Sequence, residues 1–449
     1  MSRYKRIPRR RAAFRNPEIE LSPDKYEAMD ILMRELEAHR EATLAGAAGT
    51  GKTTLMRALG ARWKKGNVLL CAPTGKAAKR LSEVTGRSAK TIHGLIYMGA
   101  AEMEDESGKT YLEFGEAQIS NILKGDLVIV DEASMVNEDL ANDLRRAVEA
   151  ADAYLLFVGD QEQLQPVTGT WGAPLDNATY TLTKIHRQAL DSPVLQLATL
   201  IRQGEGGKFR NWGEYVSWEW ARNINPAVDW MLQDRTNRVL LTFTNARRSA
   251  LNLMARRKLN KPQRVPTVGE PILVTLNSKS VGYMNGETFT IRAIRPYDRM
   301  SKIIGHPVYW VTTDNGTRVM LTPDGFDGHL RHDGRRITET RFNRQLWVNM
   351  FLRFNDPRRR DLFRKHNLND RSYEALRNEV LDYKIQGTWG YALTVHKSQG
   401  SQWKEVGFVS DPAFQGLKKK DPTFAKRLAY TAVTRAAEKY KAFILRGGR

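Results

Sequence analysis

The sequence predicts an α/β protein with parallel sheets and more than one domain. Its 449 residues are about three times the length of a typical domain. Apolar runs at 68–72, 127–130 and 154–158 do not alternate with polar residues, which is the pattern of strands buried on both faces of a parallel sheet. From Val268 the pattern changes to short β runs with an Asn-Gly turn at Asn285, which favours a small barrel.

Composition narrows the class of protein. Lys and Arg total 71 against 50 Asp and Glu, and the resulting net charge of +21 favours a polyanionic partner. The charge is uneven, because 331–365 and 416–449 are basic whereas 102–116 is acidic. A hydrophobic content of 41% excludes a disordered chain, and no apolar run is long enough to span a membrane. The single Cys71 points to a reducing compartment without a structural metal.

A glycine-rich loop follows the first expected helix and strand. Ser22 and Pro23 signal the start of a helix that continues to about Ala38. A strand at 42–45 leads into the loop, and a second helix is expected over 54–61. In such a P-loop, backbone N–H groups surround phosphate oxygens, a lysine reaches the β- and γ-phosphates, and a hydroxyl holds Mg²⁺. The candidate residues are Gly46, Gly49, Thr50, Gly51, Lys52, Thr53 and Thr54, with Lys52 for phosphate and Thr53 for the metal.

Acidic and amide side chains follow two of the buried strands. Asp131 and Glu132 come directly after 127–130, and Gln161 follows 154–158. In P-loop enzymes an acid at this place holds Mg²⁺, and a neighbouring residue orients the attacking water. We therefore expect Asp131 to bind the metal and Glu132 to orient the water. Gln161 would sense the γ-phosphate as a neutral donor.

Seven short motifs occur in an order that resembles the RecD/Dda-like branch of superfamily 1 helicases. They are 46–54 (motif I), 72–78 (Ia), 91–93 (Ib), 131–134 (II), 159–161 (III), 391–401 (V) and 430–436 (VI). The resemblance covers most of the chain between Leu21 and Leu445. It implies two RecA-like domains with ATP and Mg²⁺ in the cleft between them, and movement in the 5′→3′ direction on single-stranded DNA.

The resemblance also implies a division of the chain into domains. They are a basic N-terminal arm at 1–16, the ATP-binding RecA-like domain 1A at 17–96 and 119–176, a pin (domain 1B) at 97–118, RecA-like domain 2A at 177–265 and 386–449, and an SH3-like barrel (domain 2B) at 266–385.

Two insertions add expectations of their own. The pin reads as two short strands around a turn at 106–109, and its acidic tip suits either a wedge that parts DNA strands or a solubilising loop. Within domain 2B, residues 355–386 are charge-rich and expected to be helical. The run Arg358–Arg360 either meets DNA or another domain, or is only a solvated face.

Two arginines are candidates for the finger that stabilises charge on the departing γ-phosphate. Arg435 lies in a stretch, 424–438, that is expected to be helical. Arg187 occupies a place similar to the family's motif IV arginine. By the same resemblance, Gln399 and Gly400 are expected to contact the nucleotide.

Lys25 is a departure from the family pattern. The family usually has glutamine at this place, where it reads adenine through paired amide hydrogen bonds. Lysine carries donors only and cannot repeat both contacts. We therefore expect Lys25 to lie at the nucleotide but to allow several NTPs.

The DNA track is expected along motifs Ia, Ib and V. Hydroxyl, imidazole and ammonium groups there suit phosphate contacts, which are blind to base sequence. The candidates are Pro73, Thr74, Lys76, Thr91, His93, Thr394, His396 and Lys397. Four tryptophans that lie among apolar residues are expected to pack in the core or between domains and not to stack on bases, namely Trp212, Trp218, Trp220 and Trp230.

These features predict an ATP-dependent DNA helicase, expected to be a monomer in the cytoplasm of a bacterial or phage-infected cell. Its partners would be single-stranded DNA and forked duplex DNA, together with a single-stranded-DNA-binding protein or replisome components. Two alternatives stay open, a translocase that displaces proteins or remodels strands and a non-catalytic nucleic-acid scaffold. RNA also stays open as a substrate, because residues that contact only phosphate do not read the 2′-OH.

Overall fold

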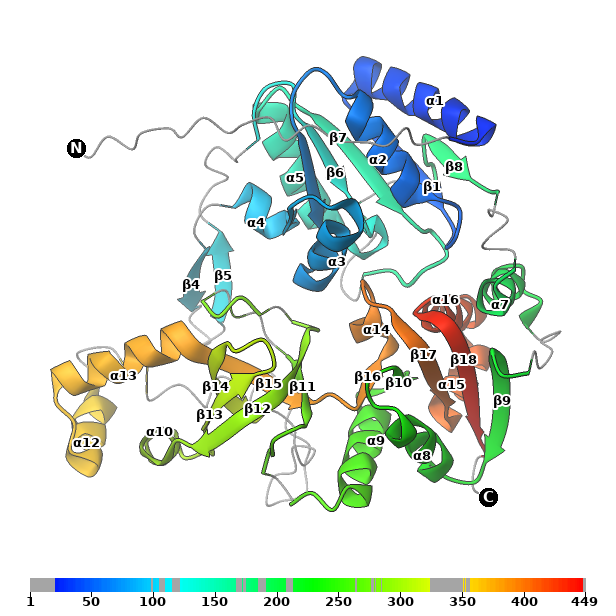
Figure 1. The fold of residues 1–449 in the computed structure, drawn as a ribbon. Helices are drawn as coiled ribbons and strands as arrows, with labels where there is room; N and C mark the ends of the chain where they lie inside the picture. Colours follow the sequence, from blue (N-terminus) through cyan, green and yellow to red (C-terminus); the bar gives the residue numbers. More distant parts are fainter. Residues whose placement is uncertain are drawn as a thin grey trace, which may run out of the picture. The chain divides into compact units, whose positions relative to one another are not determined.

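The computed structural model describes residues 21–97, 100–104, 110–114, 122–166, 172, 175–184, 191–206, 213–262, 265–275, 278, 280–283, 285–323, 350, 352 and 356–446. The chain forms two compact units, each built on a parallel sheet (Figure 1). The two parallel sheets confirm the predicted α/β class. The second unit also contains a closed barrel. The N-terminal arm, Trp212, Arg187 and the turn of the pin lie outside the described residues. Within the described ranges, no helix is long and apolar enough to cross a membrane.

The first sheet has six parallel strands in the order β3-β2-β6-β7-β1-β8. Its strands are β1 (Glu41–Gly46), β2 (Val68–Ala72), β3 (Ala89–Thr91), β6 (Leu127–Val130), β7 (Tyr154–Gly159) and β8 (Tyr180–Leu182). Its helices are α1 (Pro23–His39), α2 (Lys52–Arg62), α3 (Gly75–Thr85), α4 (Ile92–Ile96), the 3₁₀ turn η1 (Ala133–Met135) and α5 (Glu138–Ala150). A separate two-stranded sheet contains the expected strands of the pin, β4 (Ala100–Glu104) and β5 (Thr110–Phe114).

Successive residues of β6 enter two different hydrophobic cores. Leu127 and Ile129 pack in the core that includes residues of α1 and α2. Val128 and Val130 pack in the core that includes residues of α4 and α5. Because both faces of the sheet are covered, a central strand must be apolar at every position. This is the physical origin of the unalternating runs in the sequence.

The strand β8 extends the first sheet past residue 176, where the predicted domain 1A ended. Leu182 of β8 pairs in parallel with Gly46 at the end of β1. A strand of three residues carries too little hydrophobic periodicity to be recognised from sequence.

The second sheet has five parallel strands in the order β16-β10-β17-β18-β9. They are β9 (Val216–Ala221), β10 (Arg238–Thr242), β16 (Ala392–Thr394), β17 (Trp403–Ser410) and β18 (Ala436–Leu445). The associated helices are α7 (Pro193–Arg202), α8 (Asn225–Gln233), α9 (Asn245–Lys258), α14 (Val395–Ser398), α15 (Pro412–Lys420) and α16 (Pro422–Val433).

The helix expected over 424–438 is shorter in the structure. It ends at Val433, and the chain enters β18 at Ala436. Strand β18 lies between β17 and β9, so its backbone groups are satisfied by two neighbouring strands. Sheet pairing therefore overrides the local helical pattern, and Arg435 lies in the turn between helix and strand.

The barrel closes from five strands, β11 (Pro271–Val274), β12 (Thr288–Pro296), β13 (Tyr309–Thr313), β14 (Arg318–Pro323) and β15 (Lys384–Trp389). The β runs noted in the sequence correspond to β11, β12 and β13. The last strand runs beyond residue 385, where the predicted barrel segment ended. The helical insertion is confirmed as α12 (Pro357–His366) and α13 (Asp370–Tyr383), which share a core with α10 (Asp298–Ile304).

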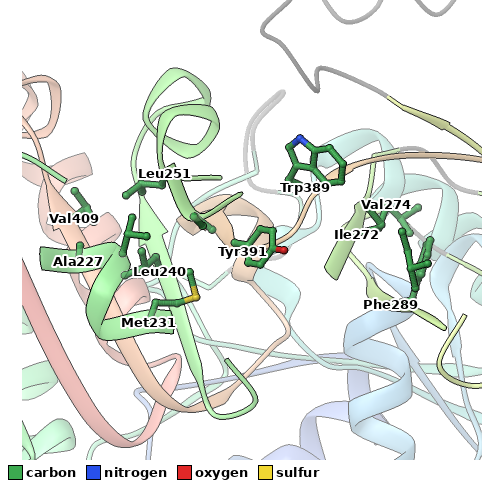
Figure 2. Packing of buried hydrophobic residues seen from close by; sticks show 14 of the residues in the cluster. Ala227, Met231, Leu240, Leu251, Ile272, Val274, Phe289, Trp389, Tyr391 and Val409 are labelled. Atoms are coloured by element: carbon green, nitrogen blue, oxygen red, sulfur yellow. The ribbon is translucent and has the colours of Figure 1, made fainter. Parts of the chain in front are cut away.

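The second sheet and the barrel share one hydrophobic core. Figure 2 shows Leu240 and Val409 on the sheet side of this cluster and Ile272 and Phe289 on the barrel side. Tyr391 lies between the two groups (Figure 2). The barrel is therefore joined to the sheet by packed side chains as well as by the two chain segments that enter and leave it.

A buried ion pair stabilises this junction. Nε of Arg256 lies 2.8 Å from Oε1 of Glu270, and their side chains are 3% and 0% exposed. Tyr391 donates its hydroxyl hydrogen to the same carboxylate oxygen at 3.0 Å, and the backbone N–H and hydroxyl of Thr267 donate to the other. The Arg256 guanidinium also lies 3.7 Å from the centre of the Trp389 ring. Such a pair is tolerated in the interior because its hydrogen-bonding groups have partners.

Two of the four tryptophans do not lie in a hydrophobic core, so the core part of that prediction is wrong for them. Trp218 and Trp220 are 41% and 53% exposed, with ring centres 6.3 Å apart. Both lie on β9, an edge strand that has β18 as its neighbour in the sheet. The position of a strand at the edge depends on pairing with distant segments, so the local sequence does not reveal that these side chains are exposed. Trp230 packs against the shared core, as expected.

The arginine run on α12 is divided by burial. Arg359 is 9% exposed and pairs with Asp370 at 2.7 Å, so it serves the internal structure of the insertion. Arg358 pairs with Asp356, which also caps the helix. Arg358 and Arg360 are both exposed, so both fit the solvated face that the sequence left open, and only the buried Arg359 does not.

Candidate functional site

The glycine-rich loop joins β1 to α2 in a conformation that requires small residues. Gly49 and Gly51 have φ values of 81° and 86°, in the left-handed region that favours glycine. A Cβ on Gly46 would lie 2.7 Å from the Thr50 hydroxyl oxygen. That hydroxyl is buried and donates to the carbonyl oxygen of Ala47 at 2.9 Å. The loop is therefore held in its curved shape by its own contacts.

The start of α2 leaves donors available to an anion. Lys52 is the first residue of the helix, and the preceding Gly51 provides no side-chain cap. The first N–H groups of an uncapped helix, at the positive end of its dipole, form a ready site for phosphate. The Lys52 ammonium donates to the carbonyl oxygens of Gly46 at 2.6 Å and Ala47 at 3.0 Å. Thr53 and Thr54 follow in the same turn and are half-buried.

Asp131 lies at the end of β6 and is influenced by the P-loop. Burial raises the pKa of Asp131 to about 6, with a further increase from the charge of Glu132. The positive charges of Lys52 and Arg80 act in the opposite direction on the pKa of Asp131. The two predicted residues Lys52 and Asp131 are therefore within electrostatic reach of each other. Arg80, on α3, was missed by sequence reasoning because an isolated arginine on a helix carries no signal.

Glu132 has an unusual backbone conformation. Its φ of 54° and ψ of 40° lie in the left-handed region, and its N–H donates to the Asp131 carboxylate at 2.9 Å. For a residue with a side chain this conformation costs on the order of 1–3 kcal/mol, and such strain is concentrated at functional sites. Glu132 immediately precedes the 3₁₀ turn η1 and makes no side-chain capping hydrogen bond to it.

Gln161 follows β7, the strand between β6 and β1. The turn is held by the buried Asp160, whose carboxylate accepts the N–H of Glu162 at 3.0 Å. Because the strands are parallel and adjacent, the loops that carry Lys52, Asp131 and Gln161 leave the same edge of the sheet. The structure thus gathers the predicted P-loop, metal and γ-phosphate residues of the first unit at one edge.

Lys25 lies near the beginning of α1 and is 3% exposed. Its ammonium donates to the Ser22 hydroxyl at 3.0 Å, and burial lowers the pKa of Lys25 while the charge of Asp24 raises it. Asp24 is also within electrostatic reach of Lys184. Lys184 follows β8, and β8 pairs with the end of β1, from which the P-loop begins. Through Asp24, its neighbour in sequence, Lys25 is therefore connected to the edge of the sheet that carries the P-loop.

The predicted DNA-contacting residues of the first half follow β2 and β3. Pro73, Thr74 and Lys76 lie between β2 and the first turn of α3, and they are half-buried. The Thr91 hydroxyl oxygen accepts the N–H of Gly94 at 3.0 Å and so caps α4. The hydroxyl hydrogen of Thr91 can still be donated to a phosphate. The His93 ring is 5.6 Å from the ring of Tyr97.

In the second unit, the structure brings motif VI against motif V. Arg435 is 4% exposed, and its guanidinium donates to the carbonyl oxygen of Ser401 at 3.4 Å and to the Thr434 hydroxyl at 3.2 Å. Gln399 and Gly400 directly precede Ser401, and Gly400 has a φ of 71° that favours glycine. The predicted nucleotide residues of this unit therefore form one cluster around Ser401.

The other predicted DNA-contacting residues of motif V lie at the carboxyl end of β16. Thr394 ends β16 and is buried, and His396 and Lys397 follow in α14. The Lys397 ammonium donates to the side-chain oxygen of Asn285 in the barrel segment. Burial lowers the pKa of His396, as does the charge of Lys397, so the imidazole is neutral at pH 7.

Comparison with known proteins agrees with the motif order. Residues 21–217 match a model described as an AAA domain, and residues 390–440 match the UvrD-like helicase C-terminal domain. The ATP-dependent RecD2 DNA helicase of Deinococcus radiodurans is 29% identical over 421 residues, which cover 91% of this chain and 47% of that protein. The ATP-dependent DNA helicase dda of Enterobacteria phage T4 is 25% identical over 332 residues, 67% of each chain.

The chain spans about half the length of the RecD2 relative. A solved structure of Pif1, described as a basis for DNA unwinding at forked double-stranded DNA, aligns over 94% of this chain and 92% of that one. Its sequence identity is 18% and its TM-score 0.49.

Proposed function

The chain belongs to the RecD/Dda-like helicases of superfamily 1B, and from this premise we propose that it is an ATP-dependent DNA helicase. It would move 5′→3′ on single-stranded DNA as a monomer and unwind the duplex at a fork. The observation that carries the proposal is the edge of the first sheet, where α2 begins without a side-chain cap and the charge of Lys52 lowers the pKa of Asp131. That arrangement suits the binding and cleavage of a nucleoside triphosphate.

The predicted catalytic residues divide the chemistry among them. Lys52 and the first N–H groups of α2 bind the β- and γ-phosphates, and Glu132 orients the attacking water. Gln161 contacts the γ-phosphate as a neutral donor. Arg435 and Arg187 would stabilise the charge that develops on the transferred group.

Mg²⁺ fits the donor set of this site. Thr53 and Asp131 offer a hydroxyl and a carboxylate, the hard oxygen ligands that Mg²⁺ prefers. Across the described ranges there is no group of three or more His, Cys, Asp or Glu side chains that could hold a metal. Mg²⁺ at nucleotide sites usually takes one or two protein oxygens and obtains the rest from phosphate and water. When bound, the ion would neutralise charge on the β- and γ-phosphate oxygens.

The predicted track for single-stranded DNA has two parts. Hydroxyl and ammonium groups at the ends of β2 and β3 would bind one stretch of phosphates, and those at the end of β16 would bind another. Such contacts ignore base sequence, as a translocating motor requires. Binding of ATP and release of its hydrolysis products would then move one set of phosphate contacts relative to the other.

Unwinding of forked duplexes with a single tail tests the proposal. We expect the wild type, with ATP and Mg²⁺, to unwind DNA that carries only a 5′ tail and to leave the 3′-tailed duplex intact. RNA versions of both substrates test the sugar preference, and Lys52→Ala is the inactive control. Unwinding of the 3′-tailed duplex alone would contradict the proposed polarity.

The same assay separates the alternatives. Hydrolysis stimulated by single-stranded DNA without unwinding of either substrate would favour a translocase that remodels or clears DNA. DNA binding without any hydrolysis would favour a scaffold.

A further inference from the structure

Three aromatic rings form a row at the carboxyl edge of the second sheet. The ring centres of Phe243 and Phe424 are 6.3 Å apart, and those of Phe424 and His396 are 6.0 Å apart. Phe243 follows β10, His396 follows β16 and Phe424 lies in the first turn of α16. The row is therefore assembled from segments that are distant in sequence, which is why no motif revealed it.

The position of the row is fixed by strand register. Thr242 at the end of β10 pairs with Thr394 at the end of β16, so Phe243 and His396 leave adjacent strand ends. Phe424 is held in place from the other side, because Asp421 caps α16 and accepts the Phe424 N–H at 2.9 Å. Helix α14, which carries His396, also contacts α16.

The row differs from ordinary core packing in its exposure. Phe408 and Phe414 form a ring pair in the same unit, with centres 5.0 Å apart, and are 3% and 1% exposed. Phe243, Phe424 and His396 all keep part of their surface accessible. An edge-to-face pair that stays partly open at the end of a sheet retains aromatic surface for a further flat ring.

The charges around His396 favour a neutral imidazole that can lie next to a DNA phosphate. The pKa of His396 is lowered by burial and by Lys397, so its imidazole is uncharged at neutral pH and presents an aromatic face. The Lys397 ammonium lies next in sequence and can interact with the phosphate that belongs to a stacked nucleotide. Rings together with a cation form the combination used by proteins that bind single strands without sequence preference.

We propose that Phe243, Phe424 and His396 form a stacking platform for the bases of single-stranded DNA. The inference rests on the proposed helicase function and adds a second kind of contact to it, because the predicted DNA residues of motif V bind phosphate. Stacking is tolerant of sequence, since every base has an aromatic face. A stacked base would resist slippage of the strand while the phosphate contacts are exchanged.

Oligonucleotides with and without bases provide the test. Binding of fluorescein-labelled single-stranded DNA is measured by anisotropy for an intact oligonucleotide and for one with abasic sites throughout its central stretch. We expect Phe243→Leu and Phe424→Leu each to weaken binding of the intact strand about tenfold and to leave binding of the abasic strand unchanged. Quenching of 2-aminopurine placed in the oligonucleotide should decrease in the same variants.

Two controls make the outcome specific. Trp218→Leu removes an exposed aromatic ring from the edge strand β9 of the same sheet and should not alter either affinity. Thermal unfolding verifies that each variant is folded. Equal loss of affinity for both oligonucleotides, or no loss for either, would overturn the stacking platform. Failure of the wild type to bind the intact strand would instead overturn the proposed function.

Discussion

The two parallel sheets present different chemistry at their carboxyl edges. The first edge carries Lys52, Asp131 and Glu132, and the charges of Lys52 and Glu132 act in opposite directions on the pKa of Asp131. The second edge carries neutral rings, Phe243 and His396 among them, next to the ammonium of Lys397. Phosphate transfer needs charge and oriented dipoles, whereas a base needs a flat apolar surface. One architecture is thus adapted to two ligands through the residues that follow its strands.

The first turns of the helices reveal the same contrast. Helix α2 follows Gly51, which caps no backbone N–H, so its donors remain for phosphate. Helix α9 follows Thr244, whose hydroxyl oxygen accepts the N–H of Arg247 at 3.2 Å. A helix whose first turn is already capped has less to offer an anion. The capping residue therefore decides whether the first N–H groups of a helix remain available to a phosphate.

The largest effect is expected for Lys52→Ala. Loss of the ammonium removes the charge that contacts the β- and γ-phosphates, and we expect DNA-stimulated ATP hydrolysis to fall by about 10²–10³-fold or more. Phosphate release at saturating ATP measures the effect. Retention of a tenth or more of the wild-type rate would show that ATP hydrolysis does not depend on the Lys52 ammonium.

Glu132→Gln should separate binding from hydrolysis at the same edge. The amide keeps the shape of the side chain but cannot act as the base for water, so we expect hydrolysis to fall about 10²-fold or more. Nucleotide affinity should be retained, because Lys52 and the helix N-terminus are intact. Equilibrium binding of a fluorescent ATP analogue and the rate of phosphate release test both halves. An equal loss of both would assign Glu132 a structural role.

Arg256→Met addresses the way in which the second sheet holds its barrel. The substitution leaves Glu270 as an unpaired carboxylate in the core, and we expect a loss of about 3–5 kcal/mol in the free energy of unfolding of that unit. Urea denaturation followed by tryptophan fluorescence measures it. The double variant Arg256→Met/Glu270→Leu should recover part of the loss, because it removes the unpaired charge. No recovery would mean that packing against Trp389 is the dominant contribution.

The smallest effect is expected for Lys25→Gln. A glutamine can accept from adenine N6 and donate to N7, whereas the lysine only donates. We expect the ratio of kcat/KM for ATP to that for GTP to rise about tenfold in the variant. A strong preference for ATP in the wild type would contradict the inference from Lys25.

Local patterns could be predicted from the sequence, and features that depend on distant neighbours could not. The apolar strands and the P-loop were recognisable because burial on both faces and a left-handed turn at Gly51 each impose a composition on a few consecutive residues. The end of α16, the exposure of Trp218 and the row around Phe424 depend on which strands become neighbours. Those pairings join segments far apart in the chain, so no short window of sequence contains them.

Parallel measurement of nucleotide affinity and single-stranded DNA affinity tests the separate roles of the P-loop and the aromatic row most directly. Two proteins are compared with the wild type, Lys52→Ala and the double variant Phe243→Leu/Phe424→Leu. We expect the first to lose ATP affinity while it binds single-stranded DNA normally, and the second to lose DNA affinity while it binds ATP normally. Loss of both affinities in the same proportion in either protein would contradict the assignment of Lys52 to ATP and of the aromatic row to single-stranded DNA.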